Sequence, residues 1–216
     1  MSLINYLTRI HFGPGLLDDA LRQACGRLGI TDKGLVATGL PDRVSRVLEP
    51  DISSVIFDET PQNPTEVATQ AGLQLYRNEK CDALLALGGG SAIDLAKAIA
   101  LTSSHDGPLS QYAVIHGGIA KITNRLPPLI AIPTTAGTGS EVGRGAIIVL
   151  NDHRKLGFIS PYLIPDAAIC DPELTLTLPP RLTAATGMDA LTHCVETYIA
   201  TVFNPPADGI AIDGLK

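Results

Sequence analysis

Short apolar runs alternate with segments of helical periodicity over the first 170 residues of the chain. The runs predict strands at residues 4–11, 34–38, 53–57, 83–87 and 129–132, followed by shorter strands at 147–150, 156–160 and 167–170. Apolar residues recur with helical spacing over residues 16–28, 42–48, 65–78 and 91–101. Because the strands are apolar on both faces and helices lie between them, the pattern predicts an α/β fold, in which a Rossmann-like parallel sheet is covered on both sides.

The pattern changes at Leu178-Pro179-Pro180. From residue 179 onward the spacing is helical, with helices predicted over residues 180–186 and 188–198 and from residue 207. We therefore expect two parts: an α/β domain over residues 1–178 and the beginning of an all-helical domain over residues 179–216.

The amino-acid composition of the chain restricts the classes of partner that it is expected to bind. The formal net charge is −6, and the chain has no run of Lys or Arg, which argues against nucleic acid as a partner. No apolar stretch is long enough for a signal peptide or a membrane span, and the four cysteines form no CxxC pair. A cytoplasmic protein without a membrane partner is the expectation.

The first segment with candidate chemistry is Gly88-Gly89-Gly90-Ser91, which lies between a predicted strand and a predicted helix. Glycines let backbone approach an anion, and a helix N-terminus offers unpaired N–H groups and the positive end of the helix dipole. Ser91 is placed as the helix N-cap, with Asp94 three residues on. The residues alone leave two interpretations equal: a pyrophosphate site, or a tight turn with a capping box.

A second small and hydroxyl-rich segment, residues 132–141, also follows a predicted strand and contains Thr134, Thr135 and Thr138. By itself it is equally typical of a polar loop whose threonines cap local backbone. Ligands of open α/β sheets, however, bind beyond the carboxyl ends of the strands. Two such loops therefore favour a shared binding cleft.

A third segment, residues 187–196, places Asp189 and His193 four residues apart on a predicted helix. A carboxylate and an imidazole on one helix face can bind one divalent metal. In isolation this spacing is more typical of a hydrogen bond on the helix surface.

The three segments GGGSAID, PTTAGTGSEV and GMDALTHCVE, in this order, resemble the iron-containing (group III) alcohol dehydrogenases. The resemblance implies a dehydroquinate synthase-like architecture and hydride transfer between a primary alcohol or aldehyde and NAD or NADP. It also implies a homo-oligomer, and a divalent metal that is Fe²⁺, with Zn²⁺ as the alternative.

The resemblance also assigns roles to single residues. It implies that Gly89, Gly90 and Ser91 hold the cofactor pyrophosphate and that Asp94 braces the loop or lines the nicotinamide side. Asp189 and His193 match the first two of four metal ligands. The remaining residues that it implies for the cofactor are Asn63 near the adenosine, Thr134, Thr135 and Thr138 along the cleft, and Lys155.

One departure from the family pattern concerns the end of the first core strand, where the family often has an Asp that binds the adenosine ribose. If residues 34–38 are that strand, Gly39 occupies the position and admits the 2′-phosphate of NADP. If Thr31-Asp32-Lys33 is the match instead, Asp32 restores a preference for NAD. The more apolar run favours Gly39.

A second departure is that the family's other two metal ligands lie downstream of Lys216, so we expect an incomplete, truncated enzyme. Two alternatives stay open. The chain is a non-catalytic nucleotide-binding fragment, or it is another enzyme of the same superfamily, such as a glycerol-type dehydrogenase or a sugar-phosphate cyclase.

Overall fold

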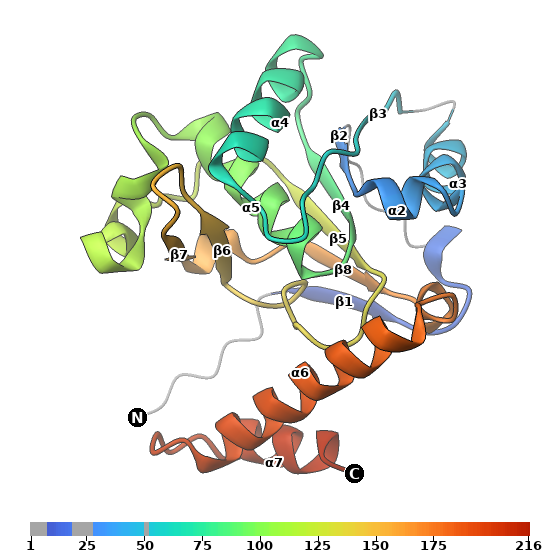
Figure 1. Cartoon of the computed structure of the whole chain (residues 1–216), viewed down its shortest axis with the longest axis vertical. Coiled ribbons are helices and arrows are strands. Elements are labelled where there is room, and N and C mark those ends of the chain that lie inside the picture. Colours follow the sequence, from blue (N-terminus) through green and yellow to red (C-terminus); the bar gives the residue numbers. More distant parts are fainter. Residues whose placement is uncertain (1–7, 19–27, 50–51) are drawn as a thin grey trace.

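The computed structural model describes residues 8–18, 28–49 and 52–216. Its centre is a six-stranded sheet in which every pairing is parallel, in the order β1-β8-β5-β4-β2-β3 (Figure 1). The strands of this sheet are β1 (Arg9–Phe12), β2 (Leu28–Ile30), β3 (Val55–Phe57), β4 (Leu84–Gly88), β5 (Leu129–Pro133) and β8 (Ala167–Cys170). The predicted parallel α/β fold is confirmed.

Helices and one hairpin surround this sheet. The α-helices are α2 (Lys33–Val36), α3 (Leu40–Leu48), α4 (Glu66–Asn78), α5 (Gly90–Ser104), α6 (Pro180–Ile199) and α7 (Pro205–Gly214). The antiparallel hairpin is formed by β6 (Gly145–Val149) and β7 (Lys155–Ile159). Short 3-10 helices are η1 (Leu109–Tyr112), η2 (Val114–His116), η3 (Gly118–Lys121), η4 (Pro161–Leu163) and η5 (Pro172–Thr175). No helix in the described ranges is both long and apolar enough to cross a membrane.

Strand β4 shows how the core is divided between the two faces of the sheet. Leu84 and Ala86 pack with α4 and α5, whereas Leu85 and Leu87 pack with α3 on the opposite face. This division follows from the period of two along a strand. All five residues of β4 are buried, so the strand is apolar throughout, as its sequence predicts.

The order of the strands creates a switch point between β2 and β4. The chain runs from β2 outward to β3 at one edge, then returns to form β4 on the other side of β2 and continues to β5 and β8. At such a point the connections leave the sheet in opposite directions, which opens a crevice at the carboxyl ends of the strands. Asp32 follows β2 at this edge, and Gly89-Gly90 follow β4.

The predicted strand at residues 34–38 is wrong. Residues Lys33–Val36 form helix α2, and the strand is Leu28–Ile30, whose first residue had been assigned to the preceding helix. Asp32 caps α2, because its Oδ1 accepts a hydrogen bond from the Leu35 amide at 3.1 Å. This cap favours a helix over residues 33–36 in place of the predicted strand. Val36, which a buried strand would cover, is 39% exposed.

The two ends of the chain depart from prediction in smaller ways. The beginning of the predicted strand at 4–11 and most of the predicted helix at 16–28 lie outside the described residues. The two helices predicted over 180–186 and 188–198 are one continuous helix, α6, because Gly187 fits within a helix at a modest cost in stability.

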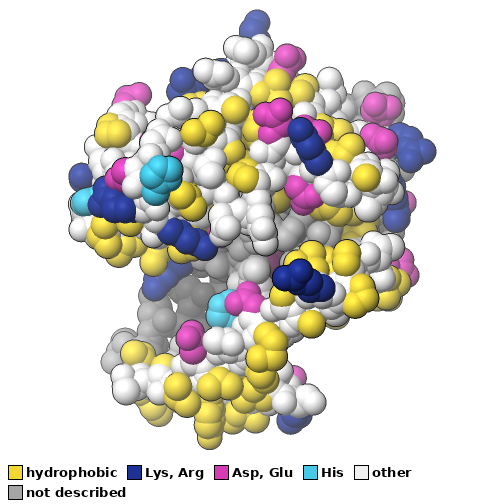
Figure 2. Space-filling view, viewed as in Figure 1, with side chains coloured by type: hydrophobic (Ala, Val, Ile, Leu, Met, Phe, Trp, Pro, Cys, Tyr) yellow, Lys and Arg dark blue, Asp and Glu magenta, His cyan; other side chains and the backbone are white. Residues whose placement is uncertain are grey.

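Helices α6 and α7 pack on each other below the sheet and extend away from it (Figure 1). No residue of α6 is buried, and hydrophobic side chains gather over the surface of this pair (Figure 2). The most exposed are Met188, Tyr198, Ile199, Val202, Phe203 and Ile210, each more than half accessible. These side chains make an exposed apolar surface on α6, on α7 and on the segment that joins them.

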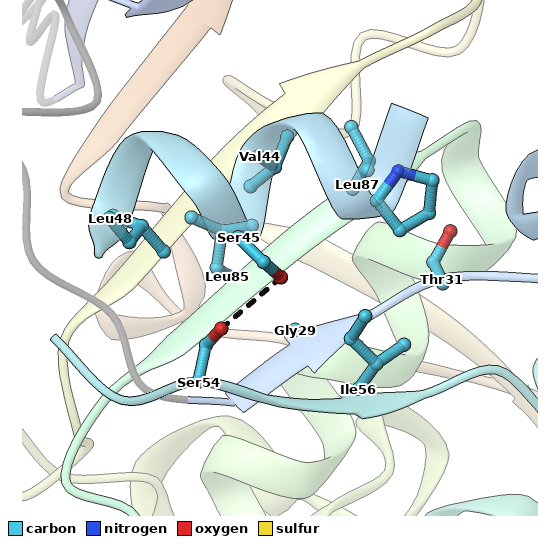
Figure 3. A pocket seen from close by; sticks show the side chains of 10 residues that line it. Gly29, Thr31, Val44, Ser45, Leu48, Ser54, Ile56, Leu85 and Leu87 are labelled. Atoms are coloured by element: carbon cyan, nitrogen blue, oxygen red, sulfur yellow. Dashed lines mark hydrogen bonds between the residues drawn. The ribbon is translucent and has the colours of Figure 1, made fainter. Parts of the chain in front are cut away.

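A small apolar cavity lies between α3 and the flank of β2, β3 and β4 (Figure 3). Val44, Leu85 and Leu87 are among the apolar residues that line it, and Ser54 Oγ donates to Ser45 Oγ at 3.2 Å beside it. The Thr31 hydroxyl also lines the cavity, is 2% exposed, and has no hydrogen-bond partner among the described residues.

Replacing Thr31 by Val is therefore expected to raise the free energy of unfolding by up to about 1 kcal/mol, because it removes a buried hydroxyl that makes no hydrogen bond. The matched variant Thr69→Val is expected to lower it by about 1 kcal/mol. Thr69 is equally buried, but its hydroxyl donates to the Thr65 carbonyl at 2.9 Å. Urea denaturation of the two variants measures both changes, and a Thr31→Val variant that loses as much stability as Thr69→Val would contradict this account.

Candidate cofactor cleft and metal pair

The glycine corner, defined as Gly88-Gly89-Gly90, joins β4 to α5. Gly89 is the N-cap residue of α5, and its carbonyl accepts from the Ala92 amide at 3.1 Å. The predicted N-cap role of Ser91 is wrong, because Ser91 lies inside the first turn and its hydroxyl donates to the Gln62 carbonyl. The N–H groups and the positive dipole end of this 15-residue helix point to the carboxyl edge of the sheet. The geometry suits an anion such as a pyrophosphate.

The loop that follows β5, residues 134–144, lies directly against this corner. The Thr134 amide donates to the Gly88 carbonyl at 3.1 Å. At Gly90 an added Cβ would stand 2.9 Å from Thr138 Cγ2, so only glycine lets the loop come this close. Thr135 also lies close to Gly89, where an added Cβ would meet its side chain at 3.3 Å. The structure thus brings together the two loops that the sequence singled out.

Asp94 braces this loop from one turn inside α5. Its carboxylate accepts a hydrogen bond from Ser140 Oγ at 2.6 Å and another from the Ile147 amide at 2.9 Å. Burial raises the pKa of Asp94, and these two hydrogen bonds partly offset the effect. Of the two roles implied for Asp94, its contacts favour the bracing role.

Lys97, one turn further along α5, was missed by the sequence predictions. Its side chain is fully buried, and Nζ donates to the carbonyl oxygens of Ser140, Gly143 and Gly145 at 2.7, 2.8 and 2.8 Å. The sequence feature that could have identified Lys97 is that it is the single basic residue in the largely apolar run IDLAKAIAL. A charge in such a helix is rarely buried without partners, but the sequence does not show which partners it has.

Asn63 and Lys155 are 92 residues apart in sequence and meet beside the first turn of α5. Lys155 Nζ donates to Asn63 Oδ1 at 3.0 Å. The neighbouring Pro64 carbonyl accepts from the Val149 amide at 2.9 Å, which ties this segment to the β6–β7 hairpin. The side chains of Asn63 and Lys155, for which the resemblance implies a cofactor role, therefore lie together, and the Ser91 hydroxyl reaches the residue before Asn63.

Asp32, not Gly39, occupies the end of the core strand at the switch point. Its Oδ2 lies 3.8 Å from the position of a Cβ built on Gly88, so the carboxylate stands beside the glycine corner. Gly39 is the N-cap residue of α3, beyond α2. The prediction that Gly39 ends the strand is wrong, and the argument for NADP loses its basis.

Asp189 and His193 face each other on α6. His193 Nε2 lies 3.8 Å from Asp189 Oδ1, and the side chains are 51% and 43% exposed. His193 Nδ1 contacts the Gly137 carbonyl at 3.3 Å. Since a carbonyl only accepts, Nδ1 is the donor in this contact, and Nε2 is the ring nitrogen that faces Asp189. The loop after β5 thereby also orients the imidazole.

The pair fits a divalent metal in the chemistry of its donors but not in their number. Carboxylate oxygen and imidazole nitrogen are ligands that Fe²⁺ and Zn²⁺ both accept. Within residues 8–18, 28–49 and 52–216, however, no group of three His, Cys, Asp or Glu side chains is placed to hold a metal. Catalytic metals usually have three or more protein ligands, so this pair alone has fewer donors than such a site requires.

The sequence profile of the family described as "Iron-containing alcohol dehydrogenase" matches residues 8–172, which is most of the chain. The chain belongs to this family. It is 55% identical to 4-hydroxybutyrate dehydrogenase of Cupriavidus necator over 222 aligned positions, which cover all of this chain and 58% of that protein.

Solved structures agree with this membership. The chain is similar to a 1,3-propanediol oxidoreductase, with a TM-score of 0.89 and 39% identity over 98% of this chain and 56% of the other. It is also similar to sulfoacetaldehyde reductase of Bifidobacterium kashiwanohense in complex with NAD⁺, with a TM-score of 0.87 and 31% identity over 98% of this chain and 57% of the other. The chain thus spans a little over half the length of these proteins.

Gly137 makes the contact between the loop after β5 and α6, and this contact can be tested. An added Cβ would stand 2.5 Å from the Thr186 carbonyl oxygen, so Gly137→Ala is expected to push α6 away from the loop. Amide exchange over residues 186–193 should accelerate about tenfold, read by mass spectrometry.

Gly187→Ala is the matched control for this variant. Nothing lies within 4 Å of a methyl group added at Gly187, and alanine is favoured inside a helix by about 1 kcal/mol. Exchange over residues 186–193 should therefore stay unchanged or slow down in the control. Equal behaviour of the two variants would show that the loop does not hold α6.

Proposed function

We propose that this chain is the cofactor-binding part of a metal-dependent alcohol dehydrogenase that uses NAD. The observation that carries the proposal is the convergence of two loops and one carboxylate at the switch point of the sheet. The glycine corner, the threonines of residues 134–138 and Asp32 all lie at the carboxyl ends of neighbouring strands. Dinucleotides bind at such crevices in open α/β sheets.

In this proposal the N-terminus of α5 binds the pyrophosphate through Gly89, Gly90 and Ser91, because backbone N–H groups and the helix dipole both favour an anion there. Thr134, Thr135 and Thr138 line the cleft above it and offer hydroxyl groups without bulk. Lys155 and Asn63, already hydrogen-bonded to each other, lie at the mouth of the cleft and contact the cofactor.

Asp32 is proposed to select NAD over NADP. A carboxylate at the end of this strand accepts hydrogen bonds from the ribose hydroxyls and repels a 2′-phosphate. The Leu35 amide occupies only one of its oxygens, Oδ1, which leaves Oδ2 on the side of the glycine corner.

Asp189 and His193 are proposed to hold Fe²⁺ together with donors beyond these two. When bound, such a metal polarises the oxygen of a primary alcohol or aldehyde and lowers the pKa of the alcohol. This chain's own contribution is positional: the Gly137 carbonyl keeps the proton of His193 on Nδ1, so that Nε2 is free to ligate. The substrates named for two relatives, 4-hydroxybutyrate and 1,3-propanediol, are both primary alcohols.

The incomplete donor set favours a second candidate, in which the 216 residues bind nucleotide without turnover of their own. Calorimetric titration of the purified chain with NADH, combined with an assay of alcohol oxidation in the presence of Fe²⁺ or Zn²⁺, separates the two. Binding with turnover supports the dehydrogenase, binding without turnover supports the second candidate, and no binding of NADH rejects both.

The selection of NAD is tested with Asp32→Asn, which keeps an oxygen for the α2 cap and removes only the charge. The ratio of NADPH to NADH dissociation constants is expected to fall by about tenfold, equivalent to about 1.4 kcal/mol. Asp42→Asn, on the exposed first turn of α3, makes the same change in net charge and should leave the ratio unaltered. A ratio that is the same in wild type and Asp32→Asn would reject this role of Asp32.

A further inference from the structure

The buried ammonium group of Lys97 is surrounded by oxygen atoms of the loop after β5 and of Gly145, the first residue of β6. Besides the three carbonyls of Ser140, Gly143 and Gly145, Ser140 Oγ lies 3.1 Å from Nζ. An ammonium group has three N–H donors, so the four oxygen atoms provide one acceptor for each donor and one additional acceptor. The arrangement resembles the coordination of a bound cation more than an ion pair on a surface.

The charge is balanced through the same loop. Ser140 Oγ donates to Asp94 Oδ1 at 2.6 Å and accepts from Lys97, so one hydroxyl links the cation to the carboxylate. Burial lowers the pKa of Lys97 to about 8, against the opposing effect of the negative charges on Asp94 and Glu141. A buried ammonium is costly unless its donors are satisfied, so the loop carbonyls and Lys97 depend on each other.

This loop is the one that covers the glycine corner. Its first half carries Thr134, Thr135 and Thr138 over Gly89 and Gly90, and its second half turns around Lys97. The Ser140 amide donates to Thr138 Oγ1 at 3.3 Å, which joins the two halves. Gly90 of the glycine corner and Lys97 both belong to α5, so one helix contacts both halves of the loop.

We propose that Lys97 is a positioning residue of the cofactor cleft, whose buried ammonium acts as an internal cation that folds residues 140–145 inward and holds the threonines over the glycine corner. This inference rests on the proposed function, because it assigns a purpose to the shape of that same cleft. A lysine that only fills the core would stabilise the whole domain equally and would have no selective effect on this loop.

The test uses the variant Lys97→Met, which keeps the apolar stem and removes the ammonium. Without cofactor, amides of residues 138–146 are expected to exchange about tenfold faster, while amides of β4 and β5 keep their rates. The dissociation constant for NADH should rise about tenfold or more, measured by calorimetry. Lys121→Met removes an exposed lysine of η3 and should change neither quantity.

Ser140→Ala provides a second variant in case Lys97→Met does not fold. It removes one oxygen and the link to Asp94 while the three carbonyls stay, so the same two changes are expected in the same direction and a few-fold in size. Unchanged exchange over residues 138–146 in the variants that fold would overturn the proposal. Equal acceleration over this loop and over β4 and β5 would overturn it as well.

The pH dependence of NADH binding gives a readout that a structural role would not produce. The titratable groups around Lys97 are Asp94 on its own helix and Glu141 on the loop, with Lys155 of β7 on the far side of Asp94. Above about pH 8 the amine loses its charge and one N–H donor, so the wild-type dissociation constant should rise between pH 7 and 9.5. Lys97→Met should show no such rise, and identical profiles for the two proteins would overturn the proposal.

The outcomes also separate this inference from the proposed function. A wild-type chain that binds no NADH rejects the proposed function, whereas the exchange experiment is read without cofactor and still decides whether Lys97 shapes the loop.

Discussion

A charged ammonium group with no access to solvent must be surrounded by oxygen atoms, and in this protein Lys97 meets that requirement through residues 140–145, which follow the loop segment beside the glycine corner. The oxygens that Lys97 uses are main-chain carbonyls of residues 140–145, which would otherwise need partners of their own. The cation and the loop therefore satisfy each other. Because α5 packs against the centre of the sheet, a loop tied to α5 is also tied to the strands that support the cleft.

Close approach is the second constraint on this region. At Gly90 and at Gly137 a single methyl group would collide with the opposite wall of the contact, in one case with the Thr138 side chain and in the other with the Thr186 carbonyl. The first contact brings the glycine corner and the loop after β5 together, and the second brings the same loop against α6. The same loop thus touches the proposed cofactor site on one side and, through His193, the proposed metal ligands on the other.

Helices α6 and α7 have a different character from the rest of the structure. They pack on each other, leave large apolar side chains exposed, and carry the candidate metal pair Asp189 and His193. Both features fit a family whose compared members are nearly twice as long as this chain. The described α/β part, by contrast, has a buried core on both faces of its sheet.

Local patterns in the sequence were sufficient for the fold class, for most elements and for the segments that form the cleft. Fully buried strands such as β4 read as unbroken apolar runs, Thr65 is recognisable as the cap of α4, and the two loops follow their strands directly. Residues 34–38 were misassigned because a short apolar run fits either a strand or a helix, and the Asp32 cap settles the choice. The identity of the residue at the switch point depended on that assignment.

What the sequence by itself determined were those features that depend on residues close together in the chain: helical periodicity, strand burial, capping, and the spacing of Asp189 and His193. Only the tertiary structure decided which distant residues meet. Three such contacts join positions more than 40 residues apart, and the sequence around each residue does not indicate its partner. They are the contacts of Lys97 with residues 140–145, of Asn63 with Lys155, and of Gly137 with His193. The physical reason is that a buried polar group must find a partner somewhere in the fold, but the order of strands in the sheet, which local propensity does not encode, decides where that partner lies.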